Sequence, residues 1–342
     1  ARTESNFSDY EGASSSNVWY TAQFINPLFP VYLKDAEGKT VISPNGEAQL
    51  DWGESKRIGN LNDFSSLGML LLDKAGTKRD IMGLRTGIVL GGDADRFGFA
   101  KGLRLSINLG ADVVNSHRFS YKNNKHGNQA KAGGMLEKSN SRTQSYTFNQ
   151  LVTWDRSFGL HTFGALMGHE WYQYDYSLIQ AAKSNLVEGI LELRPGTTPV
   201  TTDSYSQVYK INSFLSRINY NYTETYYFSA SYRRDASSRF HKDHHTGSFW
   251  SVGGNWRISN EAFMKPLYGV DNLSFKASYG EQGNDDILDN LGYSIYYLWQ
   301  SLYNLDWSNG NNIGALISTL ENKTLTWEKN GNFNIGLEGV LF

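Results

Sequence analysis

Residues 226–263 constrain the fold more than any other stretch, because they read as two long strands around one polar loop. Successive side chains of a strand point to opposite faces, so every second residue shares a face. One face of the first strand carries Tyr226, Phe228, Ala230 and Tyr232, and the other carries Tyr227, Ser229, Ser231 and Arg233. A period of two with one apolar and one polar face predicts a transmembrane β-barrel.

The second strand repeats this pattern, with Trp250, Val252, Gly254 and Trp256 alternating with Ser251, Gly253, Asn255 and Arg257. The 342-residue chain has 14% aromatic residues, 34 glycines and only 6 prolines, which suits many long strands better than a helical bundle. Its net charge of −2 offers no general electrostatic footprint for nucleic acid. The absence of cysteine fits export through an oxidising periplasm.

Membrane helices and a signal peptide are not expected. No apolar run approaches the roughly 18 residues that a membrane helix needs, and the most apolar piece, 67–72, is far shorter. The first ten residues, ARTESNFSDY, are polar and do not resemble a signal peptide. For an outer-membrane protein we therefore expect a mature chain or a fragment.

The lengths of the connections support a barrel. Alternating stretches predict strands at 81–99, 102–121, 142–156, 161–176, 206–222, 226–240, 249–258, 273–283 and 326–341. Short or medium connections at 100–101, 157–160, 223–225 and 259–272 alternate with longer polar ones at 122–141, 177–205, 241–248 and 284–325. An up-and-down barrel with short turns on one side and long loops on the other predicts this alternation. We assign 1–80 to an extracellular loop region with short irregular or helical pieces, and 81–342 to barrel strands.

The last third of the chain contains five motifs that occur together, in this order, in one protein family. They are 232–240 (YRRDASSRF), 256–264 (WRISNEAFM), 273–284 (LSFKASYGEQGN), 325–329 (LTWEK) and 334–338 (NIGLE). They resemble the RRDGSSRF hairpin, the WRISEEDFM turn, LKLRASYGVTGN, LKWEK and NIGLD of the SusC/RagA-type TonB-dependent outer-membrane transporters of Bacteroidetes. The departures are mild: Ala236 replaces a usual glycine, and Trp250 stands where the family usually has proline.

The resemblance implies about nine strands of a 22-stranded plugged barrel, cut from inside a longer protein. It also implies import of a glycan or peptide across the outer membrane, with a SusD-like surface lipoprotein as partner. The TonB complex would drive import by pulling on a plug domain, which this chain does not contain. Cofactors and catalytic residues are not implied, and the barrel would contact outer-membrane lipid.

Aromatic residues crowd the last long loop, where membrane anchoring is not required of them: Tyr296, Tyr297, Trp299, Tyr303 and Trp307. Amphipathic rings of this kind stack on sugar faces, which makes these residues candidates for substrate binding. They equally suit packing of the loop on itself or against the lipoprotein.

Two clusters have the residue types of a metal site. Asp285, Asp286 and Asp289 offer hard oxygen ligands for calcium, but without the glycine and final glutamate of an EF-hand. The stretch 241–245 (HKDHH) has imidazole and carboxylate ligands, although a solvated hairpin loop is the simpler interpretation. The charged residues of 233–239 suit either substrate binding or a hydrogen-bonded ladder in the lumen.

The resemblance thus implies an outer-membrane nutrient importer. We find no nucleophile elbow or Walker loop, so we expect its chemistry to be binding and gated passage. A passive porin is one alternative. A secreted β-rich glycan-binding protein or glycoside hydrolase is the other, and a soluble protein would not be expected to place Trp and Tyr on one face of successive strands.

Overall fold

The structure is a computed structural model of the chain, and it confirms an all-β, antiparallel, up-and-down architecture. It describes residues 2–4, 22–23, 30–51, 66–91, 101–125, 129–266, 268–290, 292–310 and 312–341. Within these ranges no helix is long and apolar enough to cross a membrane.

Ten strands form one sheet in the order β1-β2-β3-β4-β5-β6-β7-β8-β9-β12. Their bounds are β1 Arg2–Glu4, β2 Lys74–Gly91, β3 Leu103–Lys122, β4 Met135–Phe158, β5 His161–Ser184, β6 Thr198–Tyr222, β7 Tyr226–Ser237, β8 Thr246–Arg257, β9 Val270–Asn284 and β12 Glu328–Leu341. A separate antiparallel hairpin consists of β10 Leu302–Asn309 and β11 Asn312–Thr319. The short elements are α2 Ser66–Leu72, η2 Ala130–Ala132 and η3 Ile258–Asn260.

Most strands extend further than their apolar alternation predicted. The connection expected at 122–141 is shorter, because β4 already begins at Met135. The connection expected at 177–205 shrinks to the residues between Ser184 and Thr198, since β5 and β6 continue into it. The expected strand 81–99 begins earlier, at Lys74, and its last eight residues lie outside the described ranges. Polar sequence forms strand here because backbone pairing continues where alternation has ended.

The chain divides into two compact units that strands β2 to β6 pass through. Unit 1 contains 1–82, 113–143 and 176–206, and unit 2 contains 83–112, 144–175 and 207–342. In unit 1, Tyr121, Leu136 and Leu186 form a buried apolar cluster. Beside α2, the Asp73 carboxylate accepts hydrogen bonds from the backbone N–H and the side-chain amide of Asn123, at 2.9 and 2.6 Å.

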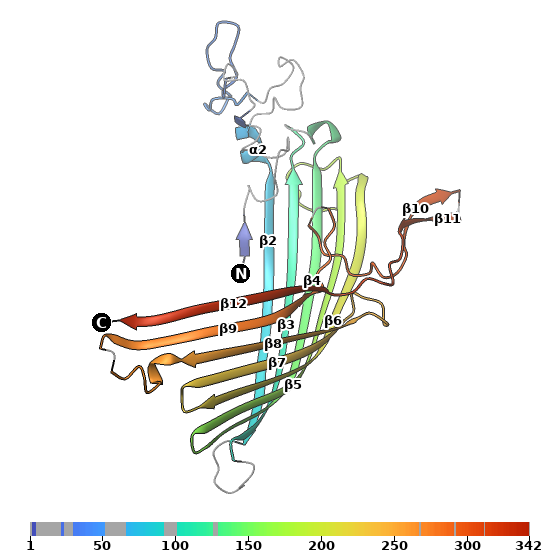
Figure 1. The fold of residues 1–342 in the computed structure, drawn as a ribbon. Helices are drawn as coiled ribbons and strands as arrows, with labels where there is room; N and C mark the ends of the chain where they lie inside the picture. The colour runs from blue at the N-terminus through green and yellow to red at the C-terminus, as the bar shows by residue number, and fades with distance from the viewer. Residues whose placement is uncertain are drawn as a thin grey trace. The chain divides into compact units, whose positions relative to one another are not determined.

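In unit 2, strands β7, β8, β9 and β12 lie side by side in continuous antiparallel register (Figure 1). Tyr232 pairs with Trp250, and Val252 pairs with Tyr279. Tyr279 in turn pairs with Phe333 of β12. Large apolar side chains of four strands are thereby aligned on one face.

We call this side of unit 2 the apolar face. Its aromatic and aliphatic side chains are exposed to between 37% and 69% of their surface: Phe228, Trp250, Val252, Trp256, Tyr279, Phe333, Ile335 and Leu337. Soluble monomers rarely expose a large, contiguous apolar surface of this kind. The face therefore has the chemistry of a surface that lipid covers.

The opposite side, which we call the polar face, carries serine, asparagine, glycine and paired charges. The hydroxyl groups of Ser231 and Ser251 lie 2.6 Å apart across β7 and β8. Lys276 of β9 forms an ion pair with Glu338 of β12. On β2 and β3, Arg85 forms an ion pair of 2.5 Å with Asp112. The two faces confirm the alternation read from the sequence.

The turn after β8 is tied to the aromatic end of the apolar face. The carboxylate of Glu261 accepts hydrogen bonds from Tyr226 Oη at 2.5 Å and from Trp256 Nε1 at 2.9 Å. These hydrogen bonds hold the pKa of Glu261 below its usual value. In the same turn, the Asn260 amide donates to the carbonyl of Glu224 at 3.0 Å. The WRISNEAF motif thus joins two neighbouring turns.

Candidate functional site

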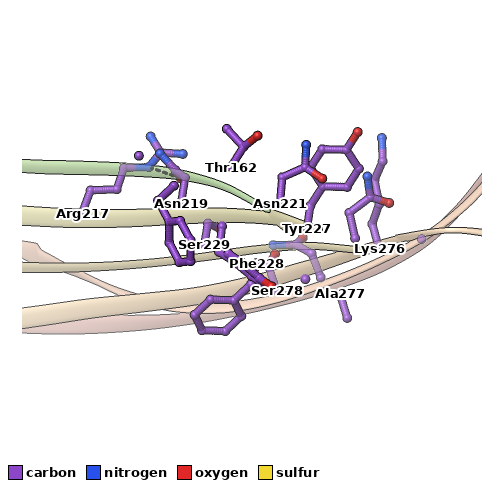
Figure 2. Close-up of a pocket in the computed structure, with 18 of the residues that line it drawn as sticks. Thr162, Arg217, Asn219, Asn221, Tyr227, Phe228, Ser229, Lys276, Ala277 and Ser278 are labelled. Atoms are coloured by element: carbon purple, nitrogen blue, oxygen red, sulfur yellow. Dashed lines mark hydrogen bonds between the residues drawn. The ribbon is translucent and has the colours of Figure 1, made fainter. Parts of the chain in front are cut away.

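The candidate functional site is the polar face of unit 2, where two concave regions follow one another along the strands. The region nearer the short turns has a volume of about 800 Å³. Strands β4 to β9 and β12 contribute to it, and its polar lining includes Thr162, Arg217, Asn219, Asn255, Lys276 and Asn334. Figure 2 shows Arg217, Asn219 and Lys276 on one side of the strands, with Phe228 and Ala277 on the other.

The charged groups of this first region are paired with neighbouring side chains on the polar face. Arg217 donates a hydrogen bond from Nε to the side-chain oxygen of Asn219, at 3.1 Å. Lys276 is paired with Glu338, and Asp155 lies on the same lining. Side chains with both donor and acceptor groups can exchange hydrogen bonds with a hydrated solute, so the wall suits polar cargo.

The second region, of about 710 Å³, lies toward the long loops. At its edge, Arg233 donates two hydrogen bonds from Nε to the Asp235 carboxylate, at 2.7 and 2.9 Å. The same guanidinium contacts Ser213 Oγ at 3.0 Å and Glu170 Oε1 at 3.4 Å. Only 5% of the surface of Asp235 is exposed, and a buried carboxylate is costly unless a cation pairs with it. Arg233 therefore belongs to a ladder of paired groups on the wall.

The final arginine of the same motif, Arg239, holds a loop against the wall. Its guanidinium carbon lies 5.0 Å from the ring centre of Tyr209 and 4.7 Å from that of Tyr296. It also forms an ion pair with Asp286. Arg239 is only 7% exposed, so this contact between a cation and two rings is largely desolvated. We call Arg239, Tyr209, Tyr296, Asp285 and Asp286 the Arg239 cluster.

The two carboxylates of the Arg239 cluster already have donors. Asp285 accepts hydrogen bonds from Tyr209 Oη at 2.8 Å and from Ser237 Oγ at 2.6 Å. Asp286 accepts one from Ser294 Oγ at 2.8 Å. Partial burial opposes ionisation of Asp286, but the bonds from Arg239 and Ser294 outweigh it, so its pKa lies below the usual value.

The metal candidates of the sequence are placed in hydrogen-bonded turns. Asp289 accepts the backbone N–H of Tyr293 at 2.8 Å. In the 241–245 loop, His241 lies 3.3 Å from Asp243, and the carbonyl of His245 accepts the indole N–H of Trp327 at 2.9 Å. Among the described residues, no three histidine, aspartate or glutamate side chains are grouped to hold a metal ion. Calcium binding by the three aspartates stays a prediction without structural support.

The four loop aromatics whose side chains the structure describes do not form one platform. Tyr296 lies in the Arg239 cluster, and the hydroxyl of Tyr297 accepts the backbone N–H of Val208 at 2.9 Å. Trp299 lies beside His241, with ring centres 6.0 Å apart. Tyr303 is 54% exposed on β10, and Trp307 pairs with Gly314 across the hairpin, its side chain lying outside what the structure describes. Tyr296 and Tyr297 thus hold the loop, and substrate contact stays a prediction for all five.

Sequence reasoning did not identify Tyr209 or Glu261 as structurally important. Tyr209 is an ordinary member of a strand pattern, and its link to Arg239 requires the loop after β9 to fold back. Glu261 lies in the WRISNEAFM motif. A carboxylate close in sequence to the aromatic end of a strand could have indicated that it binds the neighbouring rings.

No protein-family model matches the chain. The TonB-dependent receptor P3 of Formosa agariphila is 26% identical over 240 residues, covering 69% of this chain and 22% of the relative. The TonB-dependent receptor SusC of Bacteroides thetaiotaomicron is 24% identical over 332 residues, covering 92% of this chain and 31% of the relative.

A solved structure has the same fold. In the RagAB peptide transporter, a chain 26% identical superposes with a TM-score of 0.71, covering 82% of this chain and 30% of its own length. The chain therefore spans less than a third of the length of these relatives, which are named as receptors or a transporter and not as enzymes. With its five ordered motifs and two-faced antiparallel sheet, it is similar in sequence and in fold to TonB-dependent transporters of the SusC/RagA type.

Proposed function

We propose that this chain forms part of the channel wall of an outer-membrane, TonB-dependent nutrient importer. The observation that carries the proposal is the division of unit 2 into an apolar and a polar face, in a chain whose relatives are TonB-dependent receptors. The apolar face contacts lipid, and the polar face lines the lumen. Strands of a transmembrane barrel need these two surfaces because lipid and water lie on opposite sides.

In this proposal the wall guides cargo by hydrogen bonding and performs no bond-making chemistry. The two concave regions present amide, hydroxyl and paired charged groups, with Arg217 and Arg233 in different regions. Paired charges keep such a surface hydrated without fixing a single ion on it. The energised step belongs to a plug domain on which the TonB complex pulls, outside the sequence described above.

The partner we propose is a SusD-like surface lipoprotein that covers the loop end. Support comes from the relatives SusC and RagAB, and from the β10–β11 hairpin, which stands apart from the main sheet. On this hairpin Tyr303, Leu305 and Ile317 are each more than half exposed. Of the candidate aromatics, Tyr303 is the described ring most open to substrate or to the lipoprotein.

The substrate class we propose is an oligosaccharide or a short peptide, since both need a wide, polar passage. One growth experiment separates them. A strain that lacks the full-length gene is compared with the same strain after the gene is restored, on oligosaccharides or on peptides as the sole nutrient. The restored strain is also tested with and without an intact TonB complex. The proposal is supported if growth on one nutrient class requires both the gene and the TonB complex.

Growth that continues without TonB would indicate a passive pore and would contradict the proposed mechanism. A matched pair of variants then tests the wall. Arg217→Glu reverses a charge on the polar face and is expected to slow uptake. Lys265→Glu makes the same charge change in the exposed turn after β8 and is expected to leave uptake unchanged.

A further inference from the structure

A band of polar side chains crosses the apolar face of unit 2 near its loop end. Nδ1 of His169 lies 3.2 Å from the side-chain oxygen of Gln150, and Nε2 lies 2.6 Å from that of Asn212. The same imidazole packs on Phe214, with ring centres 4.8 Å apart. We call Gln150, His169 and Asn212 the polar rung. It joins β4, β5 and β6.

Two cations flank the polar rung on the same face. Arg234 pairs with Phe214 on one side and with Ser248 on the other. Ser248 accepts the hydroxyl of Tyr232 at 3.1 Å, so Arg234 shares the face of these aromatic residues. Lys210 lies two residues before Asn212 on β6 and therefore points to the same face. Both cationic side chains are exposed.

Neither cation is neutralised locally. Within the described part of the chain, no carboxylate forms an ion pair with Arg234 or Lys210, and no hydrogen bond links either side chain to a neighbour. Asp175 lies further along β5 on this face, and its carboxylate accepts both bonds from Gln173, at 2.9 and 2.7 Å. The two cations are thus available to an external anion.

The positions of Arg234 and Lys210 along their strands indicate which kind of anion they could meet. Arg234 is eight residues from Tyr226 at the turn end of β7, and Lys210 is twelve from Tyr222 on β6. A barrel strand rises about 3.3 Å per residue and tilts by about 40°. Measured along the barrel axis from the turn ends of their strands, Arg234 therefore lies at a height of roughly 20 Å and Lys210 at roughly 30 Å. The apolar band of such a barrel is about 25 Å tall. Arginine and lysine near its upper margin extend toward the headgroups.

We propose that Arg234 and Lys210, spaced by the polar rung, bind the phosphate-bearing headgroup of an outer-leaflet lipid. The inference rests on the proposed function, because it needs the long loops to be extracellular. The guanidinium supplies a planar pair of donors for phosphate, and the lysine supplies a second positive charge. Phe214, Tyr232 and Trp250 supply the apolar neighbours for the upper part of the acyl chains.

The test measures lipid binding by the full-length protein in detergent. Native mass spectrometry follows titration with phosphatidylglycerol, with zwitterionic phosphatidylcholine as reference. We compare the native protein with the Arg234→Gln/Lys210→Gln variant. The control is Lys242→Gln/Lys265→Gln, which removes the same charge from two exposed positions in the loop and the turn. Each basic residue at a membrane surface contributes about 1 kcal/mol, so the first variant should bind the anionic lipid roughly 10- to 30-fold more weakly.

The outcomes separate the two proposals. Cell fractionation comes first: absence from the outer membrane would overturn the proposed function, and this inference with it. If the protein is in the outer membrane, an equal loss in the control variant would overturn the site alone. So would retention of lipid by the Arg234→Gln/Lys210→Gln variant. Competition by millimolar inorganic phosphate as effectively as by lipid would show a free-anion site and would also overturn it.

Discussion

At the scale of single residues, Arg239 links a loop to the wall by charge and by ring contact together. Its guanidinium lies between Tyr209 and Tyr296 and is paired with Asp286. We expect Arg239→Gln to lower the opening free energy of the 285–300 loop by about 1–3 kcal/mol, because two cation–π contacts are lost. Hydrogen exchange of that loop measures the effect.

The conservative variant sharpens this test. Arg239→Lys keeps the charge for Asp286 but loses the planar stacking on the rings, so it should give an intermediate loss of protection. Equal protection in the native protein and both variants would show that the loop is held by other contacts.

Acidification should release the same loop. The pKa of Asp286 is lower in the folded protein than in the unfolded chain, so its ion pair stabilises the loop above the usual carboxyl range. This stabilisation is lost as the pH falls below about 4 and through the lowered pKa. Loop protection measured between pH 7 and pH 3 should decline in the native protein and less steeply in Asp286→Asn. Parallel declines would count against a role for Asp286.

At the scale of strands, one close approach fixes how β9 packs on β8. A Cβ added to Gly283 would overlap the ring of Phe249, whereas one added to Gly336 of β12 would meet nothing within 4 Å. Phe249 packs with Phe240 and Trp327 in a buried cluster. We expect Gly283→Ala to destabilise the fold by about 1–3 kcal/mol and Gly336→Ala to change it little. Urea unfolding of the reconstituted protein compares them, and equal midpoints would contradict the packing.

The sequence predicted the strands well where lipid chemistry requires alternation. It predicted β7 and β8 within a few residues because each has aromatic residues on one face and serine or glycine on the other. The first residues of β4 (MLEKSNS) were assigned to a loop, because strand pairing there rests on backbone hydrogen bonds and carries no apolar period. The β10–β11 hairpin was missed for another reason: Tyr303, Leu305 and Trp307 do alternate with polar residues, but the stretch 284–325 was assigned as a whole to one long loop.

At the scale of the whole molecule, the two faces should tolerate charge very differently. Ala230 lies between Ile218 and Val252 on the apolar face, and its neighbour Ser229 lines the polar face. We expect Ala230→Arg to cost about 2–4 kcal/mol and to reduce the yield in the outer membrane, and Ser229→Arg to have little effect on either. Unfolding in lipid and immunoblots of membrane fractions measure both. Equal tolerance at the two positions would argue that lipid does not cover the apolar face.

The candidate site was less predictable than the fold. Composition and alternation identify which residues face the lumen, and the motifs identify Arg233 and Arg239 as unusual. They do not reveal that Tyr296 returns to Arg239 and Tyr209, because that contact joins segments distant in the sequence through an irregular loop. Side-chain partners across a loop depend on tertiary closure, which no local period encodes.

The β10–β11 hairpin lies in the chain between β9 and β12, yet these two strands are direct neighbours in the sheet. Insertions or deletions in it leave every register of the wall intact, and lengthening such a loop carries only a small entropic cost. In the proposed importer, this segment can therefore change in length and sequence while the strands on either side keep their pairing, as connecting segments generally do.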